Sequence, residues 1–123
     1  QYNDQPYLRL AETYLLLAEA RFRQGKTAEA AAAINAVRQR ANATPITAAQ
    51  VTLDFILDER SRELVTEEQR RATLLRTGTL IDRVRRYNPI TANAITPRDT
   101  LLPIPQEVID ANIGKPMAQN PGF

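Results

Sequence analysis

Two glutamates one helical turn apart are the residues whose type and spacing could support chemistry. Glu59 and Glu63 lie in a segment with a helical pattern, and two carboxyl groups about 5 to 10 Å apart across a cleft are the arrangement that hydrolyses glycosidic bonds. The same segment carries Arg60 and Arg62, and arginines at such spacings form ion pairs with neighbouring carboxylates. Charge pairing explains these acids better than hydrolysis does, and we predict that the protein is not an enzyme.

The charges of this segment predict a structural network instead. Arg60 and Glu63 encroach on the apolar side of the predicted helix, so part of each side chain faces the interior. A buried charge requires a partner of opposite sign, and the first helical segment offers Arg9 and Glu12. We expect a partly buried charge network made by Arg9, Glu12, Arg60 and Glu63.

The sequence contains no histidine and no cysteine. Histidine-based triads, most zinc sites, thiol nucleophiles and disulfides are therefore excluded. The four glycines are isolated from one another, so no glycine-rich phosphate loop is present. We predict no catalytic residues, no cofactor and no metal site.

Six arginines between residues 70 and 86 form the one basic concentration in a chain of formal net charge +2. A nucleic-acid interface needs basic side chains on one face with stacking groups between them. A helix would spread Arg83, Arg85 and Arg86 around much of its circumference. We expect a solvated surface here and no nucleic-acid partner.

Aromatic residues, which stack on the faces of sugars, are scarce. The chain has four tyrosines, three phenylalanines and no tryptophan. Tyr14 and Phe22 lie on the apolar face of the first predicted helix and are assigned to the core. Tyr87 and the adjacent Asn88 remain as weak candidates for ligand binding, and most of any glycan site is expected outside this sequence.

A helical hairpin is predicted to position Arg9 and Glu12 of the expected charge network. Residues 7–23 repeat apolar side chains every three or four positions, Gly25 suits the left-handed residue that ends a helix, and Thr27 suits the N-cap of the next. The apolar positions of the first helix are Leu8, Leu10, Ala11, Tyr14, Leu15, Leu17, Ala18 and Phe22, and those of the second are Ala30, Ile34, Val37 and Ala41. Because the first set covers about half a helix circumference, we expect it to leave an exposed apolar patch.

Threonines mark the expected starts of the following helices. Thr47 with Gln50 and Thr66 with Gln69 have capping-box spacing. Thr52 precedes a longer helix that carries Leu53, Ile56, Leu57 and Leu64. Gly78 is expected to end one helix, Thr79 to cap another, and Asn88-Pro89 to stop it.

The hairpin resembles a tetratricopeptide repeat, through Tyr14, Leu17, Ala18, Gly25, Ala30 and Ile34. Only two of the eight prolines precede residue 89, and proline disfavours helix interiors. The sequence therefore predicts an all-α fold: a tetratricopeptide-like helical hairpin, two or three further helices and an irregular Pro-rich C-terminal tail. We expect a single helical domain over residues 1–123, with a helical body at 1–88 and the tail at 89–123.

Four segments in a fixed order resemble the C-terminal portion of the SusD/RagB family. They are Leu8 to Ala20, Ile34 to Ala41, Ile56 to Leu64, and a tail with Leu102-Pro103-Ile104-Pro105, Ile109, Asn112 and Gln119-Asn120-Pro121-Gly122-Phe123. After Glu63-Leu64 the chain lacks the glycine, the aromatics and the aspartate that are typical of the family. This departure marks a divergent subgroup, while the helical rhythm persists through it.

The resemblance implies a non-enzymatic, glycan- or nutrient-binding lipoprotein of the outer-membrane surface. Its implied partners are an oligo- or polysaccharide, bound through an upstream part, and a SusC-like TonB-dependent transporter. The sequence would then be a piece of a longer protein, serving as helical scaffold, with a lipid anchor outside it as the only membrane attachment. The alternative is a tetratricopeptide-like protein-interaction module that binds a peptide or a partner protein.

Overall fold

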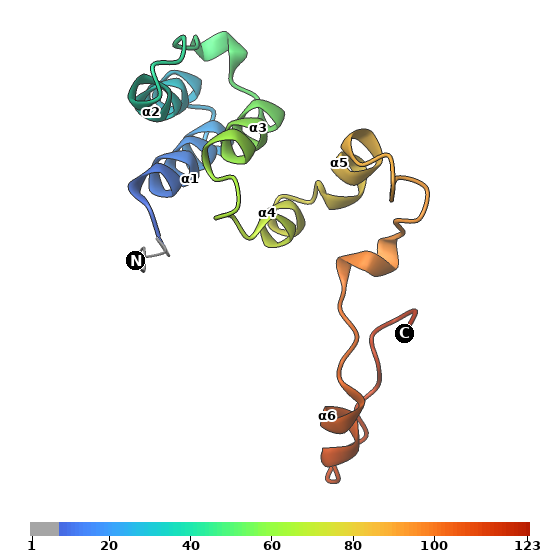
Figure 1. Cartoon of the computed structure of the whole chain (residues 1–123). Helices are drawn as coiled ribbons and strands as arrows, with labels where there is room; N and C mark the ends of the chain where they lie inside the picture. Colours follow the sequence, from blue (N-terminus) through green and yellow to red (C-terminus); the bar gives the residue numbers. More distant parts are fainter. Residues whose placement is uncertain (1–7) are drawn as a thin grey trace, which may run out of the picture. The chain divides into compact units, whose positions relative to one another are not determined.

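The computed structural model describes residues 8–123, and every regular element in this range is helical (Figure 1). The chain forms two compact units that divide between Glu68 and Gln69. The elements are α1 (Leu10–Arg23), α2 (Thr27–Arg40), the 3-10 helix η1 (Ala48–Gln50), α3 (Leu53–Glu63), α4 (Arg70–Arg76), α5 (Leu80–Tyr87), the 3-10 helix η2 (Pro97–Thr100) and α6 (Gln106–Ala111). The all-α prediction is confirmed for the described residues.

Helices α1 and α2 form the predicted hairpin of the first unit. Gly25 has a φ of +75°, a conformation open to glycine because it has no Cβ, and it turns the chain between the two helices. Helix α1 begins at Leu10, with Arg9 as its extended N-cap. Tyr7, where the sequence pattern places the start, lies outside the described residues.

The core of the first unit lies between α1 and α2. Helix α1 contributes Ala11, Leu15 and Ala18, and α2 contributes Ala30, Ala31, Ala33, Ile34 and Val37. Alanines at the contact allow two backbones to approach closely. The prediction for Ala41 is wrong, because this residue is the exposed C-cap that follows the last turn of α2.

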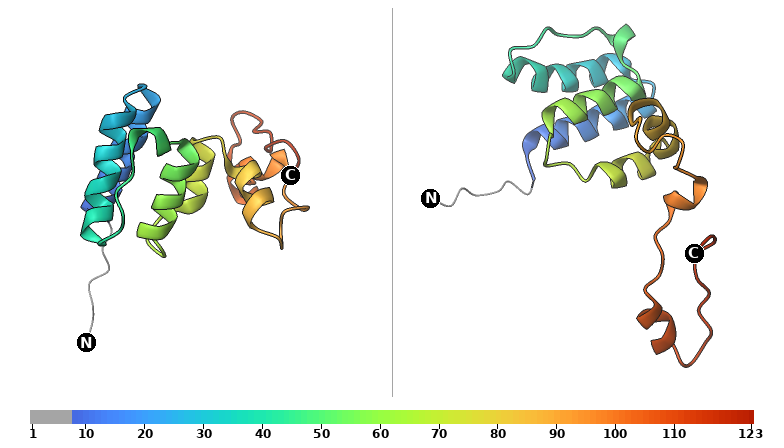
Figure 2. Two further views of the ribbon diagram at one scale, coloured as in Figure 1. Left: turned by 90° about the horizontal axis from the view of Figure 1, so that it is seen from above. Right: turned by 45° about the vertical axis from the view of Figure 1, so that its right-hand side comes forward.

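Helix α3 packs against α1 and α2 and completes the first unit, as the two views of Figure 2 show. Ile56 and Leu57 are fully buried. The N-cap prediction for Thr52 is confirmed, because its hydroxyl accepts a hydrogen bond of 3.0 Å from the N–H of Phe55. The capping box of Thr47 and Gln50 is also confirmed, around η1.

Two other capping predictions are wrong. Helix α2 starts at Thr27 itself, with Lys26 at the N-cap and no side-chain capping bond. Helix α4 starts at Arg70 behind Gln69, and Thr66 has a φ of +66°. At that angle Thr66 belongs to a left-handed turn rather than to the extended conformation of an N-cap.

The second unit consists of α4, α5 and the tail. Gly78, with a φ of +70°, ends α4, and α5 ends at Tyr87 before Asn88-Pro89, both as expected. Thr79 is the N-cap residue of α5, although its side chain makes no capping bond. The tail contains η2 and α6, two short helical segments that composition did not predict.

Candidate functional site

Arg9 joins the start of α1 to the end of α3, and to the turn that follows α3, through three hydrogen bonds. Its Nη1 lies 2.9 Å from Oε1 of Glu63, and its Nη2 donates to the backbone carbonyl of Glu63 at 2.9 Å. Its Nε donates to Oε2 of Glu67 at 2.6 Å. These bonds, first that with Glu67 and then that with Glu63, raise the pKa of Arg9 above its ordinary value.

Among residues 8–123, Arg60 is the most deeply buried charged residue, with 1% of its surface exposed. Its Nη2 donates to Oε1 of Glu12 at 3.1 Å, and its Nε donates to Oε1 of Glu68. Within residues 8–123, Nη1 of Arg60 is a buried side-chain nitrogen that has no hydrogen-bond acceptor. Arg60 therefore depends on two carboxylates that come from either side of it in the sequence.

A second set of pairs joins α2 to α3. Nη2 of Arg40 lies 2.8 Å from Oε1 of Glu63, and Nη1 of Arg38 lies 2.8 Å from Oε2 of Glu59. Arg62 contacts the same oxygen of Glu59 at 2.6 Å. Glu59 and Glu63, the two carboxylates that could have formed a hydrolytic pair, are thus each bound by two arginines. This arrangement makes them partners in ion pairs.

The structure brings the four residues of the expected network together as two pairs, Arg9 with Glu63 and Arg60 with Glu12. Sequence reasoning missed Glu67, Glu68 and Arg40. The first two lie in the stretch that the sequence pattern assigned to a helix start. The sequence did offer one signal for Glu67 and Glu68. They are two adjacent acids shortly after Leu64, and acids near a buried arginine are suitable partners for it.

Tyr87 and Asn88 end α5 and begin the next turn. The Tyr87 side chain is exposed, and the guanidinium carbons of Arg83 and Arg86 lie 4.8 and 5.7 Å from its ring centroid. The side-chain oxygen of Asn88 accepts hydrogen bonds from the N–H groups of Ile90 and Thr91. Asn88 thus has a local role in the turn, and ligand binding by either residue stays a prediction.

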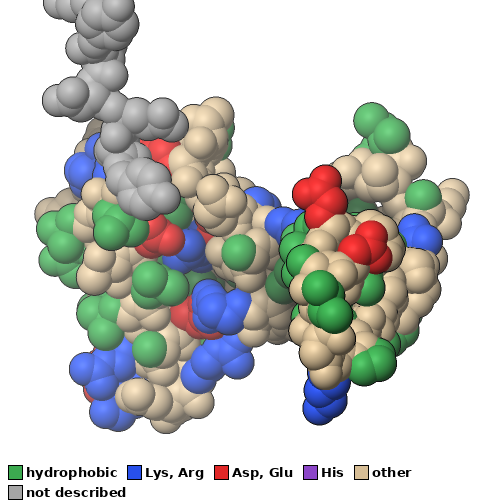
Figure 3. All heavy atoms as spheres, turned by 90° about the horizontal axis from the view of Figure 1, so that it is seen from below, with side chains coloured by type: hydrophobic (Ala, Val, Ile, Leu, Met, Phe, Trp, Pro, Cys, Tyr) green, Lys and Arg blue, Asp and Glu red, His purple; other side chains and the backbone are tan. Residues whose placement is uncertain are grey.

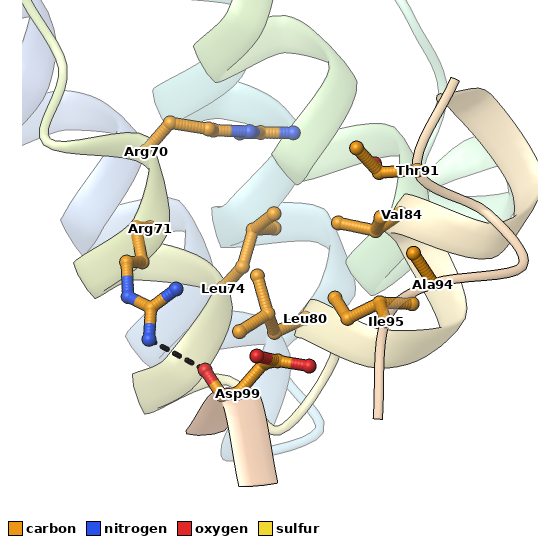
Figure 4. A pocket seen from close by; sticks show the side chains of 9 residues that line it. All are labelled: Arg70, Arg71, Leu74, Leu80, Val84, Thr91, Ala94, Ile95 and Asp99. Carbon is orange, nitrogen blue, oxygen red and sulfur yellow. Dashed lines mark hydrogen bonds between the residues drawn. The ribbon is translucent and has the colours of Figure 1, made fainter. Parts of the chain in front are cut away.

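A cavity of about 440 Å³ lies within the second unit (Figure 4). Its lining combines apolar side chains with two arginines, a threonine and an aspartate: Arg70, Arg71, Leu74, Leu80, Val84, Thr91, Ala94, Ile95 and Asp99. Arg71 donates to the backbone carbonyls of Asp99 and Leu101. The Asp99 carboxylate accepts from the N–H and hydroxyl of Thr96 at 2.7 and 3.0 Å, which lowers its pKa. Arg71 and Asp99 are therefore engaged in holding the tail.

Helix α1 has an exposed apolar patch, as expected, made by Leu10, Tyr14 and Leu17. The assignment of Tyr14 to the core is wrong, because 36% of its surface is exposed. Leu10 has 68% of its surface exposed, and Leu17 has 42%. Figure 3 shows hydrophobic side chains that reach the surface among charged ones. Across residues 8–123, none of the helices combines the length and apolar character needed to cross a bilayer.

Comparison with known proteins gives one family and two curated relatives. The model of the SusD family matches residues 1–123. The chain is 36% identical over 124 residues to the starch-binding protein SusD of Bacteroides thetaiotaomicron, covering 98% of this chain and 22% of that protein. It is 39% identical over 113 residues to the SusD-like protein P25 of Formosa agariphila, covering 85% of this chain and 21% of that protein.

No solved structure matches this chain. The chain spans about a fifth of the length of the curated relatives it matches. The family match extends from the hairpin, through the charged end of α3, to the tail that closes with Gln119-Asn120-Pro121-Gly122-Phe123. The chain belongs to the SusD family.

Proposed function

We propose that this chain is the helical scaffold of a non-enzymatic glycan-binding protein of the cell surface. The observation that carries the proposal is the family match over residues 1–123, joined to 36% identity with a protein named for starch binding. The charged side chains support it, because Glu59 and Glu63 are both bound by arginines. Carboxylates held in that way stabilise helix contacts rather than transfer protons.

The glycan-binding surface is proposed to lie mainly in the rest of the full-length protein. Sugar sites rely on flat aromatic faces, and Tyr87 is the only exposed aromatic residue that we retain as a candidate. Its ring already lies beside the guanidinium groups of Arg83 and Arg86. Tyr87 and Asn88 therefore remain secondary candidates.

The experiment is a binding assay with the full-length protein that contains this chain. Amylopectin, pullulan, xylan and pectin are presented by affinity electrophoresis, and released reducing ends are measured in the same samples. We expect retention by at least one polysaccharide and no release of reducing ends. Hydrolysis, or the absence of retention by any polysaccharide on a wider glycan array, would contradict the proposal.

A matched pair of variants separates scaffold from binding site. We expect Tyr87→Ala to leave polysaccharide affinity unchanged within about twofold, whereas a loss of tenfold or more, about 1.4 kcal/mol, would place the site in this chain. Phe123→Ala is the control for an exposed aromatic of the tail. Both variants are checked for an unchanged melting temperature, so that a loss of affinity reports on contact with the glycan.

The partner and location are proposed from the same family membership. The full-length protein would be a lipid-anchored outer-membrane lipoprotein that works with a SusC-like TonB-dependent transporter. Co-purification of an epitope-tagged protein from detergent-solubilised outer membranes is expected to recover such a transporter. Recovery of the protein from the cytosol without one would contradict both assignments.

A second candidate function is favoured by the exposed patch on α1. Leu10, Tyr14 and Leu17 lie on a tetratricopeptide-like hairpin, and such hairpins use exposed faces to bind peptides. This protein-interaction function predicts further 34-residue repeats before α1 in the full-length sequence. The glycan-binding proposal predicts a lipobox cysteine and an aromatic-rich segment there.

A further inference from the structure

The tail is closed by side-chain amides rather than by backbone pairing. Nε2 of Gln119 donates to the carbonyl of Ile104 at 2.8 Å, and Oε1 of Gln119 accepts from the N–H of Ile104 at 2.8 Å. Nδ2 of Asn120 donates to the carbonyl of Leu102 at 2.7 Å. Figure 1 shows the two extended segments on either side of α6 running beside each other. These bonds join residues that flank a loop from 105 to 118.

Proline explains why side chains make these bonds. Pro103, Pro105 and Pro121 lack the N–H that a strand ladder needs. A glutamine amide supplies a donor and an acceptor together, so it replaces a backbone partner where proline removes one. Asn35 makes the same pair of bonds with the N–H and carbonyl of Ile46, at 2.8 and 2.9 Å. The chain therefore uses one device at two loops.

A second contact fixes the end of the tail. The guanidinium of Arg98 donates to the carbonyl of Gly122 at 3.3 Å and lies 5.0 Å from the ring centroid of Phe123. Gly122 has a φ of +90°, and a Cβ at this position would lie 2.8 Å from Cγ and Cδ of Arg98. Only a residue without a side chain lets the arginine cover the backbone so closely.

Burial does not hold the loop between these contacts. Helix α6 has six residues, none of them buried, and a helix of that length is unstable by itself in water. Val108 has 49% of its surface exposed, and Ile113 has 94%. Few buried contacts and exposed backbone are the features of a segment that opens locally.

We infer that residues 119–123 form a terminal clasp, a conformational device that opens and closes the loop 105–118 independently of the helical core. The closed state is held by the amide of Gln119, with Asn120 and Arg98 adding to it. When the two hydrogen bonds between Gln119 and Ile104 break, the ends of the loop are no longer held together and α6 unfolds. The bonds of the clasp all join residues of the second unit, so we expect α1, α2 and α3 of the first unit to keep their protection.

Hydrogen exchange and limited proteolysis of the whole 123-residue chain test this inference. Thermolysin reports on the loop because it cleaves before exposed residues such as Ile113, whereas trypsin is unsuited because Pro116 follows Lys115. In Gln119→Ala we expect the Ile104 amide to exchange, and thermolysin to cut the loop, about tenfold faster or more, from the loss of two hydrogen bonds. Exchange in α1 should stay unchanged.

Two further variants make the test specific. Gln119→Glu keeps the size of the side chain and an acceptor for the N–H of Ile104, but it replaces the donor by a carboxylate oxygen that repels the carbonyl of Ile104, so it should also release the loop. Asn35→Ala removes the equivalent bonds at Ile46 and should leave cleavage at Ile113 unchanged. The inference is overturned if Gln119→Glu keeps the parent rates, if Gln119→Ala exposes α1 together with the loop, or if the parent Ile104 amide already exchanges freely.

Discussion

Replacing Glu63 by glutamine is the sharpest test of the charge network. The side chain of Glu63 is 7% exposed and is bound by Arg9 at 2.9 Å and by Arg40 at 2.8 Å. Breaking a fully buried pair costs about 3 to 5 kcal/mol, whereas an exposed pair is worth about 0 to 1 kcal/mol. The arginine side chains are 27% and 63% exposed, so the cost lies between these limits. We expect Glu63→Gln to lower the free energy of unfolding by about 2 kcal/mol.

The assay is urea unfolding at low salt, followed through the methyl NMR signals of Leu57, which is buried in α3. With a slope of about 1 to 3 kcal/mol per molar urea for a small protein, the expected midpoint shift is roughly 1 M. Glu29→Gln is the control, because Glu29 is 52% exposed and pairs with Arg21 at 3.0 Å. Its cost should stay below about 1 kcal/mol. Equal shifts in the two variants would refute the network as a source of stability.

Three further outcomes follow from the geometry. Ala30→Leu should overpack the fully buried contact between α1 and α2 and cost about 1 to 3 kcal/mol, whereas Ala32→Leu, on the exposed side, should be nearly neutral in thermal unfolding. Thr66→Gly should raise the free energy of unfolding by about 1 kcal/mol, because it relieves a β-branched residue at a φ of +66°. The Asp99 carboxyl carbon should titrate by NMR below the ordinary aspartate pKa of about 3.9, because the hydrogen bonds from Thr96 lower the pKa of Asp99. The stability that these bonds contribute is present above the ordinary pKa and is lost as pH falls through the lowered pKa.

Local patterns predicted the helical core well. The three-four spacing of Ala11, Leu15 and Ala18 placed the buried face of α1 correctly, because one helical face is enough to determine it. The same pattern left Glu19 on the polar side, yet Glu19 is buried and bonds Arg23 at 2.9 Å. A carboxylate can be buried when an arginine one helical turn away pairs with it. The periodicity of apolar residues does not reveal such a pairing.

The charged site and the tail were less predictable, for physical reasons. Arg9 and Glu63 are 54 residues apart in the sequence. Their pairing was predicted from opposite charge and from the apolar pattern, which indicate the partners but not the geometry of the contact. At Thr66 the spacing to Gln69 suggested a cap, while the left-handed turn sends the chain to place Glu67 against Arg9. Gln119 has no periodic signal at all, since its role depends on which backbone groups proline leaves without partners.

The alanines between α1 and α2 set the thickness of the first unit. Ala30, Ala31 and Ala33 are each 6% exposed or less, and an alanine has no side-chain rotamer that could change to absorb an added methylene. Larger side chains at these positions would push the two helices apart, whereas substitutions on the outer faces leave their spacing unaffected.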